Sequence, residues 1–140
     1  MKTQKLYRPV GEKEMSLIIK SGYREFPPRL EWQPIFYPVL DEDYAAEIAE
    51  KWNTRDEFAN YLGFVTCFNV SKDIIDQYPI ENVGARNHNE IWVPAEELGK
   101  FNQSIIGPIE VLKIFIGDQF QESKDQEIKN LIRSFADEND

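Results

Sequence analysis

The chain has 140 residues, and its 25 acidic residues outnumber its 16 lysines and arginines, which gives a formal net charge of −9. This length predicts one domain with one core, and the charge disfavours nucleic acid and anionic membranes as main partners, since both need a basic footprint. One cysteine and one histidine exclude a disulfide within the chain and a Cys/His zinc site, and no apolar run of about 20 residues is present, so we expect a cytoplasmic protein outside the membrane.

The first 40 residues are predicted to form two strands and a helix, with a proline-rich loop between them. We expect a strand over Leu6–Val10, a helix over Glu12–Lys20 that ends at Gly22, an ordered loop over Tyr23–Pro34, and a strand over Ile35–Leu40. Pro38 demotes this last strand to an edge or a bulge, because proline has no N–H to donate to a ladder.

The middle of the chain is predicted to continue with a helix and a long strand. Asp41 is a suitable N-cap for a helix over Glu42–Trp52. Residues Tyr61–Val70 alternate in the manner of a strand, which would place Leu62, Phe64, Phe68 and Val70 on one face and Gly63, Val65, Cys67 and Asn69 on the other. Cys67 is expected to be a small, inert core residue rather than a nucleophile paired with His88.

The last 70 residues are predicted to hold shorter elements. We expect a helical turn over Lys72–Gln77, a polar loop over Glu81–Asn89, a strand over Glu90–Val93, a helix over Ala95–Phe101, a strand over Ile109–Ile116 and a final helix with Ile128, Leu131, Ile132 and Phe135 on one stripe. In the strand over Ile109–Ile116, Val111 and Phe115 are expected to face opposite Leu112, Ile114 and Ile116.

This order of elements predicts an α+β fold with a mixed or largely antiparallel sheet. The domain body is expected to span residues 1–120, followed over residues 121–140 by an amphipathic helix and an acidic tail. The turn after the first strand, Pro9 to Glu12, has one glycine, so the usual dinucleotide-binding fingerprint of a doubly wound fold is missing. No metal site is expected, since the acidic clusters lack the alternating spacing of a calcium loop.

Three places retain functional interest, each with a simpler alternative. Arg8 interrupts an apolar strand and either points to solvent or holds a phosphate or ribose with its planar guanidinium. Phe36 and Tyr37 are adjacent on a strand, so one ring enters the core and the other, unless it also packs there, is free to stack on a planar heterocycle. Glu90 opens a strand beside a polar loop and is either a surface residue or a carboxylate that reaches into a cleft.

The order of these motifs resembles the ADP-ribosyltransferase superfamily, and most closely its small bacterial domains, including toxin modules. Residues 6–10 (LYRPV), a helix ending at Gly22, residues 35–37 (IFY) leading into the next helix, and residues 90–98 (EIWVPAEEL) carry the likeness, which covers residues 6 to 116. The resemblance implies a split β-sheet that binds NAD in a cleft and transfers ADP-ribose to an acceptor, with loss of nicotinamide. NAD is then a substrate and no metal is needed.

Matched to the family's motifs, three positions acquire roles. Arg8 would anchor the diphosphate or adjacent ribose, Tyr37 or Phe36 would stack on nicotinamide, and Glu90 would orient the ribose and stabilise its developing positive charge. Arg29 falls in the loop that the resemblance places at the nucleotide cleft. His88 stands two residues before Glu90, where the arginine-modifying subclass carries a second Glu or Gln, so the likeness does not extend to that subclass.

Two other functions are compatible with the sequence. The same scaffold could be an inactive binding module, in which an acidic protein recognises a basic partner through the aromatic and proline-rich segment Tyr23–Trp32. A weaker alternative is a binder of nucleotides or RNA ends that uses Arg8, Arg24 and Arg29, whose signature would be a steep salt dependence.

Overall fold

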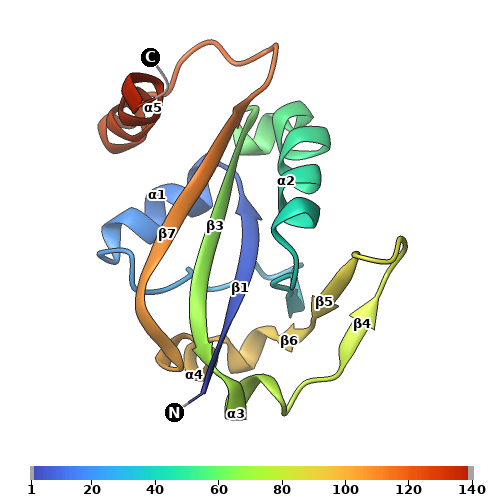
Figure 1. Ribbon diagram of the computed structural model, residues 1–140. Helices are drawn as coiled ribbons and strands as arrows, with labels where there is room; N and C mark the ends of the chain where they lie inside the picture. The colour runs from blue at the N-terminus through green and yellow to red at the C-terminus, as the bar shows by residue number, and fades with distance from the viewer. Residues whose placement is uncertain (1, 139–140) are drawn as a thin grey trace.

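Three long antiparallel strands form the centre of the molecule, in the order β1 (Thr3–Val10), β3 (Leu62–Ser71) and β7 (Ile105–Ile116). They lie side by side in Figure 1. The structure is a computed structural model that describes residues 2–138, with the side chains described to residue 136. It has an α+β fold with antiparallel sheets and short helices, as predicted. No helix among the described residues is both long and apolar enough to cross a membrane.

Short elements connect these strands. The helices are α1 (Glu12–Lys20), α2 (Glu42–Lys51), α3 (Lys72–Ile75), α4 (Leu98–Gln103) and α5 (Gln126–Glu138), and the 3₁₀ turns are η1 (Asn53–Arg55), η2 (Glu57–Ala59) and η3 (Ala95–Glu97). The remaining strands form two pairs, β2 (Ile35–Phe36) with β6 (Val93–Pro94), and β4 (Ile80–Asn82) with β5 (Asn89–Ile91). In Figure 1 the β4–β5 hairpin projects from one side of the long strands.

Val39 joins the long strands to the β4–β5 hairpin. It forms one antiparallel bridge to Tyr7 on β1 and another to Glu90 on β5. Its N–H donates to the Tyr7 carbonyl at 2.8 Å, and its own carbonyl accepts from Tyr7 at 2.9 Å. Because Pro38 has no N–H to donate, β2 ends at Phe36 and regular pairing resumes only at this one residue. The expected strand over Ile35–Leu40 is therefore two residues long.

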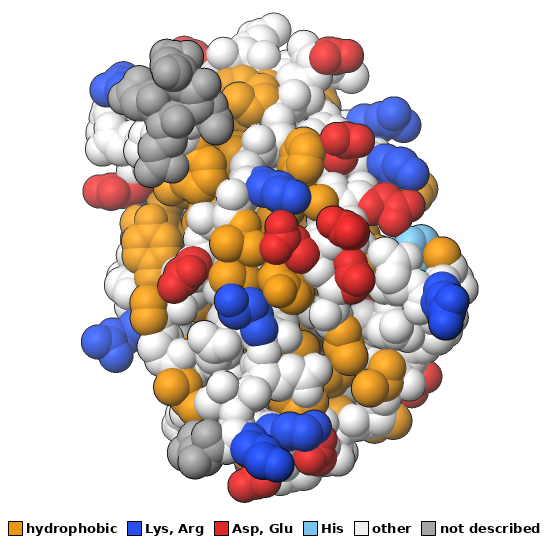
Figure 2. Space-filling model, viewed as in Figure 1, with side chains coloured by type: hydrophobic (Ala, Val, Ile, Leu, Met, Phe, Trp, Pro, Cys, Tyr) orange, Lys and Arg blue, Asp and Glu red, His pale blue; other side chains and the backbone are white. Residues whose placement is uncertain are grey.

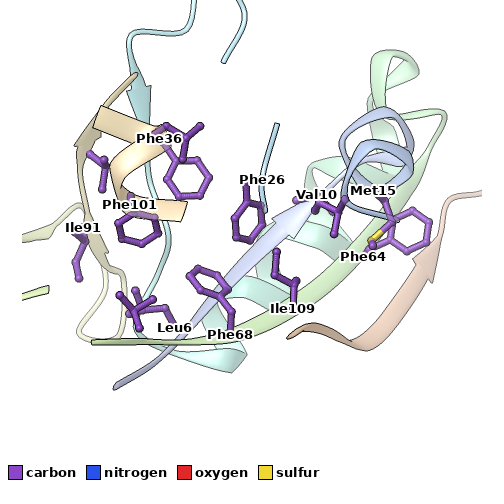
Figure 3. Close-up of a cluster of buried hydrophobic side chains, with 14 of the residues drawn as sticks. Leu6, Val10, Met15, Phe26, Phe36, Phe64, Phe68, Ile91, Phe101 and Ile109 are labelled. Carbon is purple, nitrogen blue, oxygen red and sulfur yellow. The ribbon is translucent and has the colours of Figure 1, made fainter. Parts of the chain in front are cut away.

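Each face of the central sheet is covered by helix. The main core lies on the face of Leu6, Phe64, Phe68 and Val70, where α1, α4 and α5 contribute side chains. Its centre is a set of aromatic contacts in which the Phe26 ring lies 4.9 Å from Phe68 and 5.1 Å from Phe36, between centroids (Figure 3). A second core lies on the opposite face, where α2 packs over Val65. The predicted division of β3 into two faces is confirmed.

Helix α2 can approach β3 closely because Gly63 carries no side chain. A Cβ built on Gly63 would lie 2.8 Å from the Cβ of Ala49 and 2.7 Å from its carbonyl oxygen. Such distances are too short for unstrained carbon atoms, so this contact requires glycine. Asp41 caps the helix as predicted, since its Oδ1 accepts from the N–H of Tyr44 at 3.1 Å.

Several sequence-based expectations differ from the structure. In β7, Val111 and Ile114 pack with the main core, whereas Leu112 and Phe115 pack with the second core. A register shift opposite Val65 and Thr66 explains this, because a bulge changes the phase of alternation. The strand also begins at Ile105, four residues earlier than expected. The segment Glu81–Asn89, expected as a polar loop, includes the last two residues of β4 and the first residue of β5, which pair with each other over Ile80–Asn82 and Asn89–Ile91.

The C-terminal helix α5 packs against α1 and β7. Ile128 is fully buried and belongs to the main core, and the hydroxyl of Ser16 on α1 donates to Asp125, just before α5 begins. Asp125 also accepts from the N–H groups of Glu127 and Ile128, which satisfies the first turn of the helix. Residues 121–138 thus contribute to the main core through α5.

Candidate functional site

Arg8 is buried on β1 and held by a carboxylate from the next element of the chain. Its side chain donates two hydrogen bonds to Glu14, from Nε to Oε2 at 2.7 Å and from a terminal nitrogen to Oε1 at 2.9 Å. Glu14 reaches Arg8 because α1 starts two residues after β1 ends. The guanidinium carbon also lies 4.7 Å from the Phe36 ring centroid and 5.5 Å from that of Tyr37. Arg8 is only 5 % exposed, so it does not point to solvent.

Arg29 brings a second guanidinium to the same carboxylate. Its terminal nitrogen lies 3.9 Å from Oε1 of Glu14, and its Nε donates to the Ile35 carbonyl at 3.0 Å. Burial lowers the pKa of Arg29, and the neighbouring charge of Arg8 lowers it further. Burial also disfavours charge on Arg8, but the Glu14 carboxylate outweighs this effect and the pKa of Arg8 is raised. Two cations therefore share one anion.

A cavity of about 210 Å³ opens beside this cluster. One wall combines the end of β1 and the start of α1, a second comes from the loop that carries Arg29 and Tyr37, and a third comes from α2 and the two 3₁₀ turns after it. No side chain caps the N-terminus of α1, where Gly11 is the N-cap. Lys13 adds a third cation to the lining. Cationic side chains and free backbone N–H groups favour an anionic ligand.

Tyr37 lies at the edge of this cavity and on a ladder that leads to Glu90. The bridges Ile35 to Pro94, Phe36 to Val93 and Val39 to Glu90 share one antiparallel register. Continuing that register places Tyr37 opposite Trp92. Since alternate residues of a ladder share a face, Tyr37, Trp92 and Glu90 point to the same side. Tyr37 is 39 % and Trp92 is 42 % exposed, so this side presents two aromatic rings to solvent.

The carboxylate of Glu90 is buried and oriented by two donors. Oε2 accepts from the Tyr44 hydroxyl at 2.5 Å, and Oε1 accepts from the Trp92 indole N–H at 2.9 Å. Burial and then the hydrogen bond to Glu90 raise the pKa of Tyr44, so this phenol keeps its proton at neutral pH. The Tyr44 ring stacks on His88 at 4.2 Å between centroids, and Nε2 of His88 lies 2.8 Å from a Glu47 oxygen. Helix α2 thus supports Glu90 from one side.

The residues predicted to act at a site fall into four groups. Arg8, Arg29 and Tyr37 line one cavity. Glu90 does not line it but lies on the adjoining ladder, on the face that Tyr37 shares. Phe36 points to the opposite face and is buried in the main core, where its ring contacts the guanidinium of Arg8. It is therefore not free to stack on a ligand. The side chain of Arg24 is exposed and does not line the cavity.

Several residues of the site were not predicted from the sequence, among them Trp92, Glu14 and Asn53. Trp92 could have been found, because it lies two residues after Glu90 on the same strand and therefore on the same face. Glu14 gave no signal, since an acidic residue in the first turn of a helix has an ordinary role there. Asn53 also gave none, because its position on the cavity depends on how the chain turns after α2.

The described residues offer little for thiol or metal chemistry. Cys67 is buried on β3, and burial raises the pKa of its thiol, which disfavours a reactive thiolate. Among residues 2–138 there is no group of three or more His, Cys, Asp or Glu side chains arranged to hold a metal ion.

No protein-family model, no curated protein and no solved structure matches this chain.

Proposed function

We propose that the chain binds NAD beside Arg8, Arg29 and Tyr37 and transfers ADP-ribose to an acceptor, with release of nicotinamide. One observation carries this proposal. Arg8, Tyr37 and Glu90 are far apart in the sequence, yet Arg8 lies against the Tyr37 ring and Glu90 lies on the same ladder face as Tyr37. The proposal includes a split sheet of the ADP-ribosyltransferase type, the relation to small bacterial domains and a cytoplasmic location, where NAD is present.

The size of the cavity decides how NAD would lie. At about 210 Å³ the cavity is smaller than the roughly 300 to 1,000 Å³ that hold a whole drug-sized ligand. It has room for one base with its ribose, while the diphosphate would contact Arg8, Arg29 and Lys13. The nicotinamide half would then leave the cavity along the exposed rings of Tyr37 and Trp92. That direction leads toward Glu90, which is where the bond to nicotinamide would break.

Glu90 would act on the sugar rather than on the leaving group. When the ribose C1′–N bond breaks, the electron pair leaves with nicotinamide and positive charge develops on the ribose. A fixed carboxylate near the 2′-hydroxyl stabilises that charge, and the acceptor then bonds to C1′ and loses its proton to solvent. Each oxygen of Glu90 accepts one hydrogen bond and keeps a further lone pair for the sugar hydroxyl.

The charge of the cavity is compatible with this ligand although the protein is acidic. Its lining includes the cations Arg8, Lys13 and Arg29 and the carboxylates Glu14 and Asp56, so it carries a small positive charge. On the face of the molecule seen in Figure 2, acidic and basic side chains are interspersed. A small anion therefore has a local site, whereas a long polyanion meets an overall charge of −9.

The test is to incubate the protein with NAD and measure nicotinamide release by chromatography and NAD binding by calorimetry. We expect Glu90→Gln to reduce release at least tenfold while binding is largely kept, because the variant loses the charge but not the shape of the side chain. Glu97→Gln is the matched control, since Glu97 also accepts from a tyrosine hydroxyl, that of Tyr78 at 2.8 Å, away from the site. Equal release by both variants would refute the role of Glu90.

A second candidate function is a binding module without transferase activity. The observation in its favour is exposed apolar surface. Trp32 is 73 % exposed, and Leu17, Pro28 and Phe58 line a small pocket that shares Arg29 and Gln33 with the cavity. The net charge of −9 favours a basic partner. This function predicts a stable complex that Trp32→Ser weakens and no heat of binding with NAD, so NAD binding in the micromolar range would contradict it.

A further inference from the structure

Asn53 lines the cavity and carries an unsatisfied polar atom. Among the described residues, its Oδ1 is the one buried side-chain nitrogen or oxygen without a hydrogen-bond partner in the structure. Asn53 is the first residue of η1, directly after α2, and it lines the same cavity as Arg8 and Tyr37. A buried acceptor without a donor is costly and calls for an explanation. Its position suggests that the missing donor belongs to a ligand.

The side chains around Asn53 define what kind of ligand group would fit. Val10, Ile48 and Ala59 give the cavity apolar lining, and the Phe58 ring adds a flat aromatic surface. Phe58 is 59 % exposed, and the Lys13 ammonium lies 5.8 Å from its ring centroid. A planar heterocycle would bury its faces on these walls. The amide of Asn53 would then meet the polar edge of that heterocycle.

We infer that Asn53 selects a base that carries an exocyclic amino group, which in NAD is the 6-amino group of adenine. The amino N–H would donate to Oδ1 after a rotation of the amide about its terminal torsion, which has a broad energy profile in asparagine. A base with a carbonyl at this position would place two acceptors against each other. This inference rests on the proposed function, because it assigns the cavity to the adenosine half of NAD.

The test compares NAD with nicotinamide hypoxanthine dinucleotide, which has a carbonyl in place of the amino group and a hydrogen on the adjacent ring nitrogen. Calorimetry on the full chain should show that NAD binds roughly 5- to 150-fold more tightly, the range that corresponds to leaving one buried polar group unpaired. Asn53→Ala should weaken NAD binding and bring the two dinucleotides to similar affinity. Asn130→Ala on the exposed surface of α5 is the matched control and should leave the preference unchanged.

The outcomes separate this inference from the function on which it rests. If both dinucleotides bind wild-type protein equally, the amino group is not recognised and the role of Asn53 is refuted, while NAD binding stands. If the hypoxanthine form binds more tightly, the amide presents its donor instead and the inference is also refuted. If neither dinucleotide binds, the proposed function fails, and the inference fails with it. Because wild-type protein alone gives these readings, a variant that does not fold leaves the test intact.

Discussion

Neutralising Glu14 is expected to destabilise the fold strongly, because this carboxylate is the counter-charge of a buried arginine. Glu14→Gln keeps the shape of the side chain and removes the charge that balances Arg8, which is 5 % exposed and bonded to Glu14 at 2.7 and 2.9 Å. Arg29 loses the same anion, from which it is separated by 3.9 Å. The variant therefore leaves two largely buried guanidinium groups without a counter-charge.

The expected magnitude follows from the burial of the pair. Removing one partner of a buried ion pair costs about 3 to 5 kcal/mol, because the other charge remains desolvated and unpaired. The Glu14 side chain is 20 % exposed, so water screens part of the interaction and we expect the lower end, about 3 kcal/mol. Arg8→Met combined with Glu14→Leu should cost less than Glu14→Gln alone, since that pair of changes leaves no buried charge at position 8.

Urea unfolding followed by far-UV circular dichroism measures this loss. Tryptophan fluorescence is a poorer probe, because Trp32 and Trp52 are already about 70 % exposed in the folded protein. Asp76→Asn is the control, since it breaks an exposed ion pair with Lys72 and should change the free energy of unfolding by less than about 1 kcal/mol. A loss below about 1 kcal/mol for Glu14→Gln, at an unchanged dependence on urea concentration, would refute the electrostatic account of the cluster.

Two further predictions concern packing and pH. Gly63→Ala should destabilise the fold by about 1 to 3 kcal/mol in urea unfolding, because the new Cβ would overlap Ala49. The control is Gly99→Ala, whose Cβ meets no atom within 4 Å and which should not destabilise α4. Equal effects of the two substitutions would contradict this packing. The hydrogen bond from Ser16 lowers the pKa of Asp125, so that carboxylate stabilises the fold above its ordinary pKa and loses this contribution as pH falls through the folded value. Ser16→Ala should therefore reduce stability at pH 7 more than at about pH 3, and an equal loss at both values would count against the linkage.

Much of the fold was predictable because local chemistry and burial agree. The alternation over Tyr61–Val70 predicted which side chains of β3 enter each core, and Asp41 predicted the start of α2. Which side chains of β7 face each core could not be predicted, because this depends on a bulge in its pairing with β3. A strand that is apolar on both faces gives no sequence signal for such a bulge. The strand β4 was missed because a short, polar, exposed strand resembles a loop in composition.

The candidate site was predictable in part for a similar reason. Residue type and position on a strand predicted Arg8, Tyr37 and Glu90 as site residues. The alternation of side chains along a strand would also have predicted Trp92. That Arg8 is neutralised by Glu14 could not be predicted, since the contact depends on how α1 folds back onto β1. The face on which a strand residue lies follows from the two-residue period of the strand. The partner of a buried charge depends instead on tertiary packing.

The pairing of Val39 with both β1 and β5 has a consequence for how ligand binding can be observed. A ligand that contacts both Arg8 on β1 and Glu90 on β5 would span the two sides that Val39 joins, so its binding free energy would oppose their separation. The Val39 amide hydrogen is bonded to the Tyr7 carbonyl, and it exchanges with solvent deuterium only when this connection opens. We expect its exchange to slow on NAD addition by more than that of amides inside β3, which makes this one amide a sensitive reporter of occupancy.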